Sequence, residues 1–332
     1  MPSPNTELLQ PLIKLYIQLS GGVMLGWALG RSLPKTVPTF IGQFLFWIGV
    51  PLGIITFLRR ADLSGAIWIA PVVAWVAILL GAGLAWVWMQ SRRRTPEGSQ
   101  KGSLSARDSL KQYQSSWSKP TQGSFLLASM VGNTGYLGFP VTLTLVGEKY
   151  FGWVLFYDML GTTIGAYGLG VLLAARFGGG AHSPWQLVRA ILQNPALWSL
   201  GFGLGFRQIP LPEFAERGLL GFAWSAIALS LVLIGMRLSQ LDSWSRLRQA
   251  SVTLGIKMLL VPFVLGIGLF ALGITGPPRL AIVLQMAMPP AFATLVLAEV
   301  YNLDRDLAVT ALAVGSTGLL LTLPIWLLLF SP

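Results

Sequence analysis

Residues 131–146 read VGNTGYLGFPVTLTLV, an apolar segment fit to cross a bilayer that carries an asparagine, three glycines and a proline in its middle. A second apolar segment, residues 285–296 (QMAMPPAFATLV), is interrupted in the same way at Pro289 and Pro290. Glycine and proline weaken or break a helix, so both segments are predicted to be discontinuous. Each would place irregular backbone inside a membrane.

The composition is that of an integral membrane protein. Hydrophobic residues make up 54% of the 332 and charged residues only 11%, with a mean hydropathy of +0.66. The net charge of +11 is spread between apolar segments, which indicates membrane topology rather than nucleic-acid binding. Without cysteine or a P-loop motif, and with His182 as the single histidine, the chain is expected to hold no metal or cofactor and to be no enzyme.

Apolar windows predict an all-α membrane protein of ten transmembrane helices. The expected spans are residues 12–30, 37–58, 66–89, 124–147, 151–175, 190–206, 218–238, 250–272, 279–299 and 307–330. The connections are short, except that residues 90–123 are rich in Ser, Lys, Arg and Gln and are expected to form a polar loop.

Basic residues orient these spans. The loops that follow the odd-numbered spans hold fifteen of the Lys and Arg residues, against six in the loops on the opposite side. Because cytoplasmic loops are enriched in Lys and Arg, residues 90–123 are placed in the cytoplasm and both termini outside it. We therefore expect a multi-pass protein of the cytoplasmic membrane.

An internal repeat divides the chain into residues 1–175 and 176–332. An Arg-x-Leu/Ile-Pro motif ends the first and sixth spans, at residues 31–34 and 207–210, and Pro140 of the fourth span aligns with Pro290 of the ninth. Five spans per repeat is an odd number, so the two repeats must be inserted in opposite orientations. The sequence thus predicts a five-plus-five inverted repeat in which spans four and nine are broken.

Broken spans at matching positions of two inverted repeats indicate a transporter's substrate site near the bilayer midplane. Pro140 and Pro290 can each begin a half-helix, whose N-terminus attracts anions, and Asn133 and Gln285 would supply amide groups. The alternative is that the prolines only kink two helices. We expect substrate contacts from Asn133, Gly135, Gly138, Pro140, Gln285, Pro289 and Pro290.

Few ionisable residues lie inside the spans. Asp158 is the best candidate for a proton or cation relay, and its alternative role is a structural carboxylate paired with a donor such as Thr162. Glu299 is a second coupling-ion candidate, although it closes span nine and is also explained as a boundary residue. Lys257 lies near a span end, where it can snorkel to the interface.

Four motifs resemble the auxin efflux carrier family, which includes the plant PIN-type carriers. They are residues 132–140 (GNTGYLGFP), the pair Asn194-Pro195 that opens span six, residues 288–291 (MPPA) and residues 298–304 (AEVYNLD). The resemblance extends over nearly the whole chain outside the polar loop. Plant members carry Asn-Pro-Asn-Thr-Tyr where this chain has VGNTG, a difference that argues against auxin itself as the substrate.

The resemblance implies that spans four and nine cross at the substrate site. It further implies a homodimeric scaffold formed by residues 12–58 and 190–238, and a mobile transport domain formed by residues 66–175 and 250–330. The transport domain would move like an elevator and carry a small organic anion. The resemblance implies that the site is lined by Asn133 and Pro140 of span four and by Gln285, Pro289 and Pro290 of span nine.

The sequence therefore predicts a secondary transporter that moves a small carboxylate by alternating access, with proton or sodium coupling left open. One alternative is a membrane channel, or a sensor without transport activity, whose residues 90–123 contact a cytosolic partner. Another is a sodium-coupled organic anion symporter of the bile acid symporter type, against which stands the lack of an acidic cluster in the two broken spans.

Overall fold

The computed structural model describes residues 4–93, 117–179, 192–239 and 246–331, together with Trp185 and Arg189. Most of the predicted polar loop (94–116) and His182 lie outside these residues. The described helices are α1 (Pro4–Ser32), α2 (Val37–Phe44), α3 (Val50–Arg60), α4 (Ile69–Arg93), α6 (Lys119–Met130), α7 (Phe139–Leu145), α8 (Phe151–Phe156), α9 (Val171–Gly178), α11 (Pro195–Phe206), α12 (Glu213–Leu238), α13 (Leu247–Leu254), α14 (Val261–Ala271), α15 (Gly276–Met286), α16 (Phe292–Val300) and α17 (Arg305–Phe330).

Short π-helical or 3₁₀ segments adjoin these helices: η1 (Leu45–Gly49), η2 (Thr134–Gly138), η3 (Glu148–Tyr150), η4 (Tyr157–Thr163), η5 (Ala166–Gly170) and η6 (Gly255–Leu260). All except the 3₁₀ turn η3 are π-helical. Several precede or follow a proline or glycine, where the regular hydrogen-bond ladder is hard to maintain. The helical conformation therefore continues through these segments.

Within the described residues, six helices are long and apolar enough to cross a membrane: Val37–Arg60, Ile69–Arg92, Glu148–Gly178, Glu213–Leu238, Leu247–Ala271 and Arg305–Phe330. The described residues contain no strand, so the prediction of an all-helical membrane protein is confirmed at this level. The other four predicted spans correspond to α1, the pair α6 and α7, α11, and the pair α15 and α16. A total of ten spans stays a prediction.

The two interrupted segments break where they meet. Helix α6 ends at Met130, after which Val131 is extended, whereas α15 ends at Met286 and the chain turns at Ala287 before Pro290 pairs with Gly132. The backbone N–H of Asn133 donates to the carbonyl of Pro289 at 2.7 Å, and the N–H of Ala291 donates to the carbonyl of Val131 at 2.9 Å. Because hydrocarbon offers no partner for an open backbone group, each segment supplies the hydrogen bonds that the other has lost.

The first break precedes Pro140, which was expected to begin the half-helix. The helix resumes earlier, at Thr134, and Pro140 lies within the first turn of α7. Proline has no N–H to offer the carbonyl of Tyr136, four residues before it. The Oγ hydroxyl of Ser230 on α12 lies 3.2 Å from that carbonyl and 2.7 Å from the carbonyl of Ile227, and it shares its one proton between them. A neighbouring helix thus compensates for the proline, and the break falls at Gly132 and Asn133, where the N–H of Asn133 donates to the carbonyl of Pro289.

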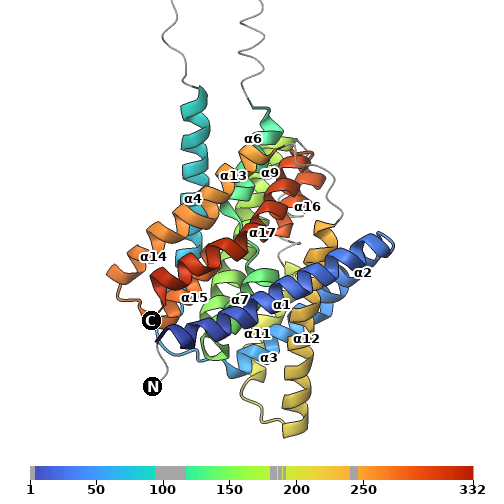
Figure 1. Cartoon of the computed structure of the whole chain (residues 1–332), viewed down its shortest axis with the longest axis vertical. Coiled ribbons are helices and arrows are strands. Elements are labelled where there is room, and N and C mark those ends of the chain that lie inside the picture. Colours follow the sequence, from blue (N-terminus) through green and yellow to red (C-terminus); the bar gives the residue numbers. More distant parts are fainter. Residues whose placement is uncertain are drawn as a thin grey trace, which may run out of the picture.

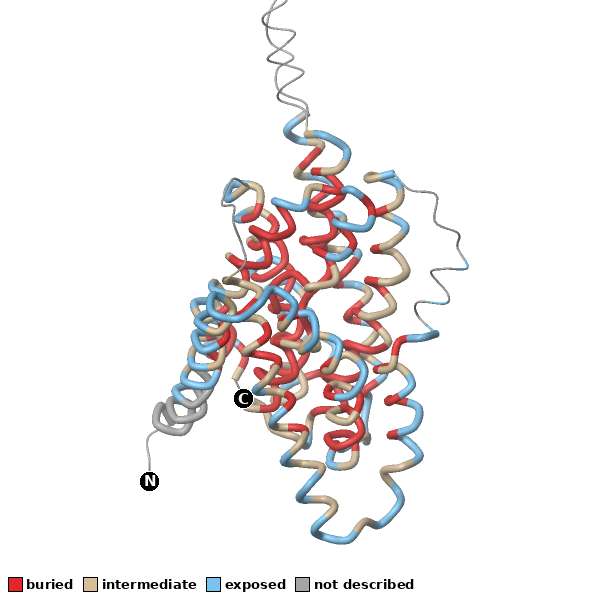
Figure 2. Tube along the Cα trace, turned by 90° about the vertical axis from the view of Figure 1, so that its right-hand side faces the viewer, coloured by how far each residue is buried: buried red, intermediate tan, exposed pale blue. Residues whose placement is uncertain are grey.

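The helices pack as two groups (Figure 1). In the first group, α1 lies along α12, and α3 packs against α11 and α12. In the second group, α4 packs against α6 and η4, while α17 packs against α13, α15 and α6. The crossing of the broken segments belongs to the second group. Figure 2 shows that buried residues concentrate along the central helices of the molecule and that exposed residues dominate the outer ones.

Glycine lets α1 and α12 approach closely. A Cβ atom at Gly26 would lie 2.0 Å from the carbonyl oxygen of Val232, and one at Gly235 would lie 2.0 Å from that of Val23. Small residues at such a contact allow backbones to touch where lipid gives little hydrophobic drive for association. The first group therefore depends on main-chain contact between its two long helices.

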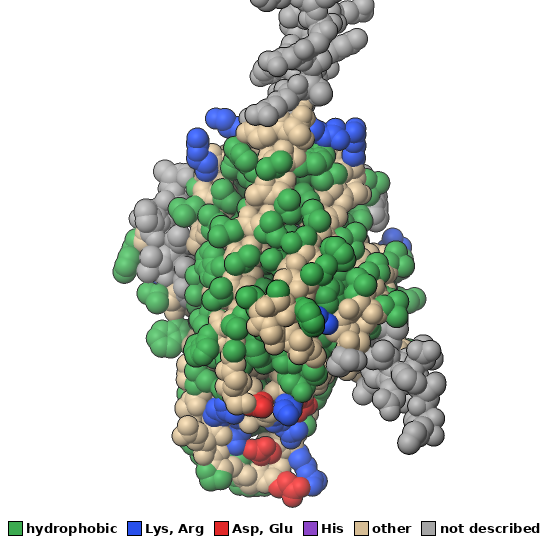
Figure 3. All heavy atoms as spheres, turned by 90° about the vertical axis from the view of Figure 1, so that its left-hand side faces the viewer, with side chains coloured by type: hydrophobic (Ala, Val, Ile, Leu, Met, Phe, Trp, Pro, Cys, Tyr) green, Lys and Arg blue, Asp and Glu red, His purple; other side chains and the backbone are tan. Residues whose placement is uncertain are grey.

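The surface suits a bilayer. The face in Figure 3 carries an apolar band, with Lys, Arg, Asp and Glu side chains mostly at its two ends. Ion pairs join Arg59 to Glu216 at 2.6 Å and Arg60 to Glu148 at 3.1 Å, between the end of α3 and the beginnings of α12 and η3. Charges gathered at helix ends leave the middle of the helices free to face lipid.

Replacement of Gly26 by Ala is expected to destabilise the protein by about 1–3 kcal/mol, because the new methyl group must push α1 away from Val232. Gly21→Ala is the matched control, since nothing lies within 4 Å of a Cβ at Gly21. Thermal unfolding of the purified variants in detergent measures both. Equal melting temperatures for the two variants would contradict the close contact.

Candidate functional site

A cavity of about 600 Å³ lies beside the crossing and between the two helix groups. That volume is within the range of small-molecule sites. The lining includes Thr39 and Gln43 of α2, Phe46 of η1, residues 131–136 of the crossing, Asp158 and Thr162 of η4, Asn194 at the start of α11, Leu233 and Arg237 of α12, residues 291–293 at the start of α16, and Leu295, Leu297, Glu299, Arg305 and Leu312.

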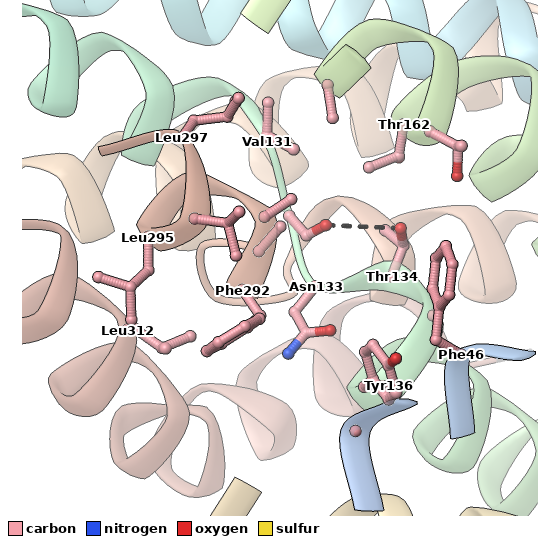
Figure 4. Close-up of a pocket in the computed structure, with 18 of the residues that line it drawn as sticks. Phe46, Val131, Asn133, Thr134, Tyr136, Thr162, Phe292, Leu295, Leu297 and Leu312 are labelled. Carbon is pink, nitrogen blue, oxygen red and sulfur yellow. Dashed lines mark hydrogen bonds between the residues drawn. The ribbon is translucent and has the colours of Figure 1, made fainter. Parts of the chain in front are cut away.

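Asn133 presents a free carboxamide to this cavity. Its side chain is 5% exposed and occupies the capping position before η2, yet it makes no capping hydrogen bond. Figure 4 shows its carboxamide extending into the space between the rings of Phe292 and Tyr136. A buried amide without a partner in the described part of the chain can donate to and accept from a ligand.

Two helix N-termini open onto the same cavity. One begins at Thr134 after Asn133 and the other at Phe292 after Ala291, and neither has a side-chain cap. Unpaired N–H groups and the helix dipole give such ends a partial positive charge that attracts anions. The start of α11 differs, because the side chain of Asn194 accepts from the N–H of Ala196 at 3.0 Å. The crossing therefore favours a negative group.

Asp158 lies on η4 at the wall of the cavity and is 5% exposed. Its carboxylate accepts a hydrogen bond from the hydroxyl of Thr134, the first residue of η2. Thr162, the partner considered from the sequence, also lines the cavity. The structure thus joins the coupling-ion candidate directly to the broken segment.

Glu299, the other coupling-ion candidate, lines the cavity at the end of α16. Its carboxylate pairs with Arg305 at 2.8 Å, and its side chain is 48% exposed. An exposed ion pair of this kind contributes little to stability. Its role in coupling stays a prediction.

Gly138 and Gln285 meet beside the crossing and do not line the cavity. Gln285 is fully buried, and its Nε2 donates to the hydroxyl of Thr142 at 3.0 Å. A Cβ atom at Gly138 would lie 2.4 Å from Oε1 of Gln285. The Oε1 atom has no hydrogen-bond partner among the described residues. This amide fastens α15 to α7, whereas Asn133 and Gly135 line the cavity.

The three prolines shape the crossing from outside the cavity. Pro289 and Pro290 pack against α17, where a Cβ atom at Gly315 would lie 2.8 Å and 3.1 Å from them. Pro140 lines a separate, smaller hollow against α3 and α12. None of the three lines the cavity, and their role as substrate contacts stays a prediction.

Lys257 lies at the crossing and not at the interface to which snorkelling would take it. Its side chain is 3% exposed, and its Nζ donates to the carbonyl of Met286 at 2.6 Å. A Cβ atom at Gly132 would lie 3.0 Å from that Nζ. The broken end of α15 leaves a carbonyl that a cation can satisfy, and helix C-termini attract positive charge. The position of Lys257 in the sequence could not predict this contact, because the contact depends on the residue at which α15 ends.

Arg237 is a site residue that the sequence did not single out. It lies in the last turn of α12 and lines the cavity. Its position follows from the packing of α12 against the crossing, which no local pattern encodes. Among the described residues no group of three or more His, Cys, Asp or Glu could hold a metal ion.

Comparisons with known proteins find similar sequences among membrane transporters. The sequence model of a family described as membrane transport protein matches residues 116–327, well over half of the chain. The chain is 28% identical to an uncharacterised transporter of Methanothermobacter thermautotrophicus over 84% of each protein. It is 28% identical to an uncharacterised transporter of Methanocaldococcus jannaschii over 61% of this chain and 67% of that one. A probable auxin efflux carrier component 5b of Oryza sativa is 25% identical over 41% of this chain and 40% of its own.

Gly138→Ala is expected to destabilise the protein by about 1–3 kcal/mol, because the methyl group must displace the buried carboxamide of Gln285 and break its hydrogen bond to Thr142. Gly135→Ala, on the same segment, brings its Cβ no closer than 3.6 Å to Asp158 and should stay within about 0.5 kcal/mol of the parent. Denaturant or thermal unfolding in detergent compares them. A Gly138→Ala protein as stable as Gly135→Ala would show that Gln285 is free to move.

Proposed function

Because the chain belongs to the membrane transport protein family, the family of the auxin efflux carriers, we propose that it is a secondary transporter for a small organic anion that carries a carboxylate. The observation that carries the proposal is the cavity beside the two broken helices, onto which two uncapped helix N-termini and the carboxamide of Asn133 open. Discontinuous helices that aim their N-termini at anionic groups are a recurrent feature of transporter sites.

The proposed site holds the carboxylate at the crossing. The N–H groups at the starts of η2 and α16 and the amide of Asn133 would donate to its oxygens. Apolar side chains such as Phe46, Leu295 and Leu312 would take the rest of the molecule. Partial charges of the backbone attract an anion without the desolvation penalty of several buried cations.

Transport would proceed by alternating access between the two helix groups. The first group, α1 to α3 with α11 and α12, would be the scaffold, and the second group would be the transport domain that moves past it. The packing of α1 on α12 supports a rigid scaffold, and the hydrogen bonds of the crossing support a transport domain that moves as one body. In this proposal α1, α11 and the two broken pairs complete ten spans, arranged as a five-plus-five inverted repeat.

The same proposal places the protein in the cytoplasmic membrane with residues 94–116 inside the cell and both termini outside. In the face of Figure 3, basic side chains stand at the end from which α4 and α6 lead toward that segment. The opposite end shows both basic and acidic side chains. An excess of Lys and Arg at one end of the spans supports a cytoplasmic assignment for it.

A carboxylate-specific site predicts unequal effects of two substitutions at Asn133. Asn133→Ala removes the amide and should lower uptake of the transported carboxylate into liposomes by about tenfold, the value of one hydrogen bond to a charged group. Asn133→Asp keeps the shape and a good helix-capping residue but places a negative charge beside the substrate, so uptake should fall further.

The melting temperature of Asn133→Asp is the control for folding. It should stay near that of the parent, because Asp is a good residue at that capping position. The parent must also show saturable uptake that carboxylate on the opposite side accelerates, as a carrier does. A flux that does not saturate with substrate concentration and rises in proportion to voltage would indicate a channel instead of a carrier. Equal uptake by the parent and Asn133→Asp would show that the substrate does not bind at the crossing.

Coupling is proposed to pass through Asp158, because its carboxylate is buried, lines the cavity and binds the first residue of the half-helix. Asp158→Asn should abolish any dependence of uptake on a pH gradient while preserving exchange of substrate across the membrane. Uptake measured with imposed pH and sodium gradients checks this. A variant that keeps the parent's gradient dependence would leave Asp158 with a structural role only.

A further inference from the structure

Four charged side chains line the cavity, and three of them have polar partners. Asp158 accepts the hydroxyl of Thr134, and Glu299 pairs with Arg305. The fourth, Arg237, forms no ion pair or hydrogen bond with any residue in the described ranges. A half-buried guanidinium with five donors and no acceptor is unusual, because buried charges are normally paired.

The position of Arg237 is well defined. Its guanidinium carbon lies 4.0 Å from the centre of the Phe292 ring, and a Cβ atom at Gly42 would be 3.2 Å from one of its terminal nitrogens. A cation in the last turn of α12 is favoured by the helix dipole. That preference explains a positive charge there but not why the charge faces the cavity.

Phe292 is the first residue of α16, so Arg237 stands beside one of the two helix starts that open onto the cavity. A carboxylate that approaches the crossing would come within reach of the guanidinium as well. A ring face is a weaker partner for a guanidinium than a carboxylate that accepts two parallel hydrogen bonds. An incoming carboxylate can therefore take Arg237 away from the ring.

We propose that Arg237 selects anionic substrates by exchanging the ring of Phe292 for the carboxylate of the substrate. The assignment rests on the proposed function, and it adds the residue that distinguishes charged from neutral molecules. Helix N-termini and Asn133 hydrogen-bond neutral carbonyl groups as well as anions, whereas a guanidinium discriminates by charge.

The exchange also affects the two helix groups. Arg237 belongs to α12 of the first group and Phe292 to α16 of the second, so the ring contact joins the two groups. Transfer of the guanidinium to a substrate removes that contact. Binding of the anion would thus loosen the interface across which the second group moves.

The test compares binding of a carboxylate and of its uncharged primary amide. The purified full-length parent is screened by calorimetry with acetate, hexanoate, phenylacetate and succinate, and the best-bound acid is carried forward with its amide. Arg237→Gln should bind the acid at least tenfold more weakly and the amide with unchanged affinity. Arg237→Lys keeps the charge without the planar fork and should fall between the parent and Arg237→Gln.

Two further variants complete the design. Arg217→Gln on the same helix removes an exposed arginine that pairs with Glu213, and it should bind both compounds as the parent does. Phe292→Leu removes the ring and keeps the cation, so its preference for the acid should equal or exceed that of the parent. Loss of the preference in Phe292→Leu would overturn the proposed exchange.

The outcomes separate the two proposals. A parent that binds none of the four acids overturns the anion function, and the role of Arg237 with it. A parent that binds an acid, together with an Arg237→Gln protein that binds acid and amide as the parent does or loses both equally, overturns only the role of Arg237. If Arg237→Gln does not fold, Arg237→Lys decides, since parent-like affinity for the acid would contradict bidentate recognition.

Discussion

Two backbone hydrogen bonds at the crossing support the rest of the structure. Asn133 and Pro289 form one, Ala291 and Val131 the other, and together they close a short antiparallel bridge in the middle of a helical protein. In hydrocarbon an open N–H or C=O is destabilising by several kcal/mol, at roughly the scale of a whole side-chain burial. Either broken helix alone would therefore be unstable, and the two can exist only as a pair.

The remaining polar groups around the crossing follow from this constraint. Lys257 satisfies the carbonyl at the end of α15, Ser230 satisfies the carbonyl freed by Pro140, and Gln285 fastens α15 to α7. The helix ends that receive no such partner are the starts of η2 and α16, and both open onto the cavity. The positive character of the site thus comes from N-termini left uncapped on the cavity side of the crossing, whereas Lys257, Ser230 and Gln285 supply hydrogen bonds on its other side.

Glycine performs two different tasks in this chain. Along α1 and α12 it permits main-chain contact between two long helices and so gives the first group a rigid interface. At Gly138 it leaves room for the buried amide of Gln285, while Gly135 leaves ordinary space beside Asp158. The glycines of α1 and α12 act along a whole helix surface, whereas Gly138 makes room for one carboxamide.

The sequence by itself determined the membrane class, the helical content and the two places where helices break, because hydropathy and the conformational limits of Gly and Pro act locally. It also identified Asn133 and Asp158, since a lone amide or acid in an apolar span stands out. Only the tertiary structure decided that the first helix resumes at Thr134, that Gln285 faces Thr142, and that Lys257 and Arg237 reach the crossing. Those facts depend on which carbonyls and rings lie opposite each segment, and such neighbours are set by packing between residues far apart in the chain.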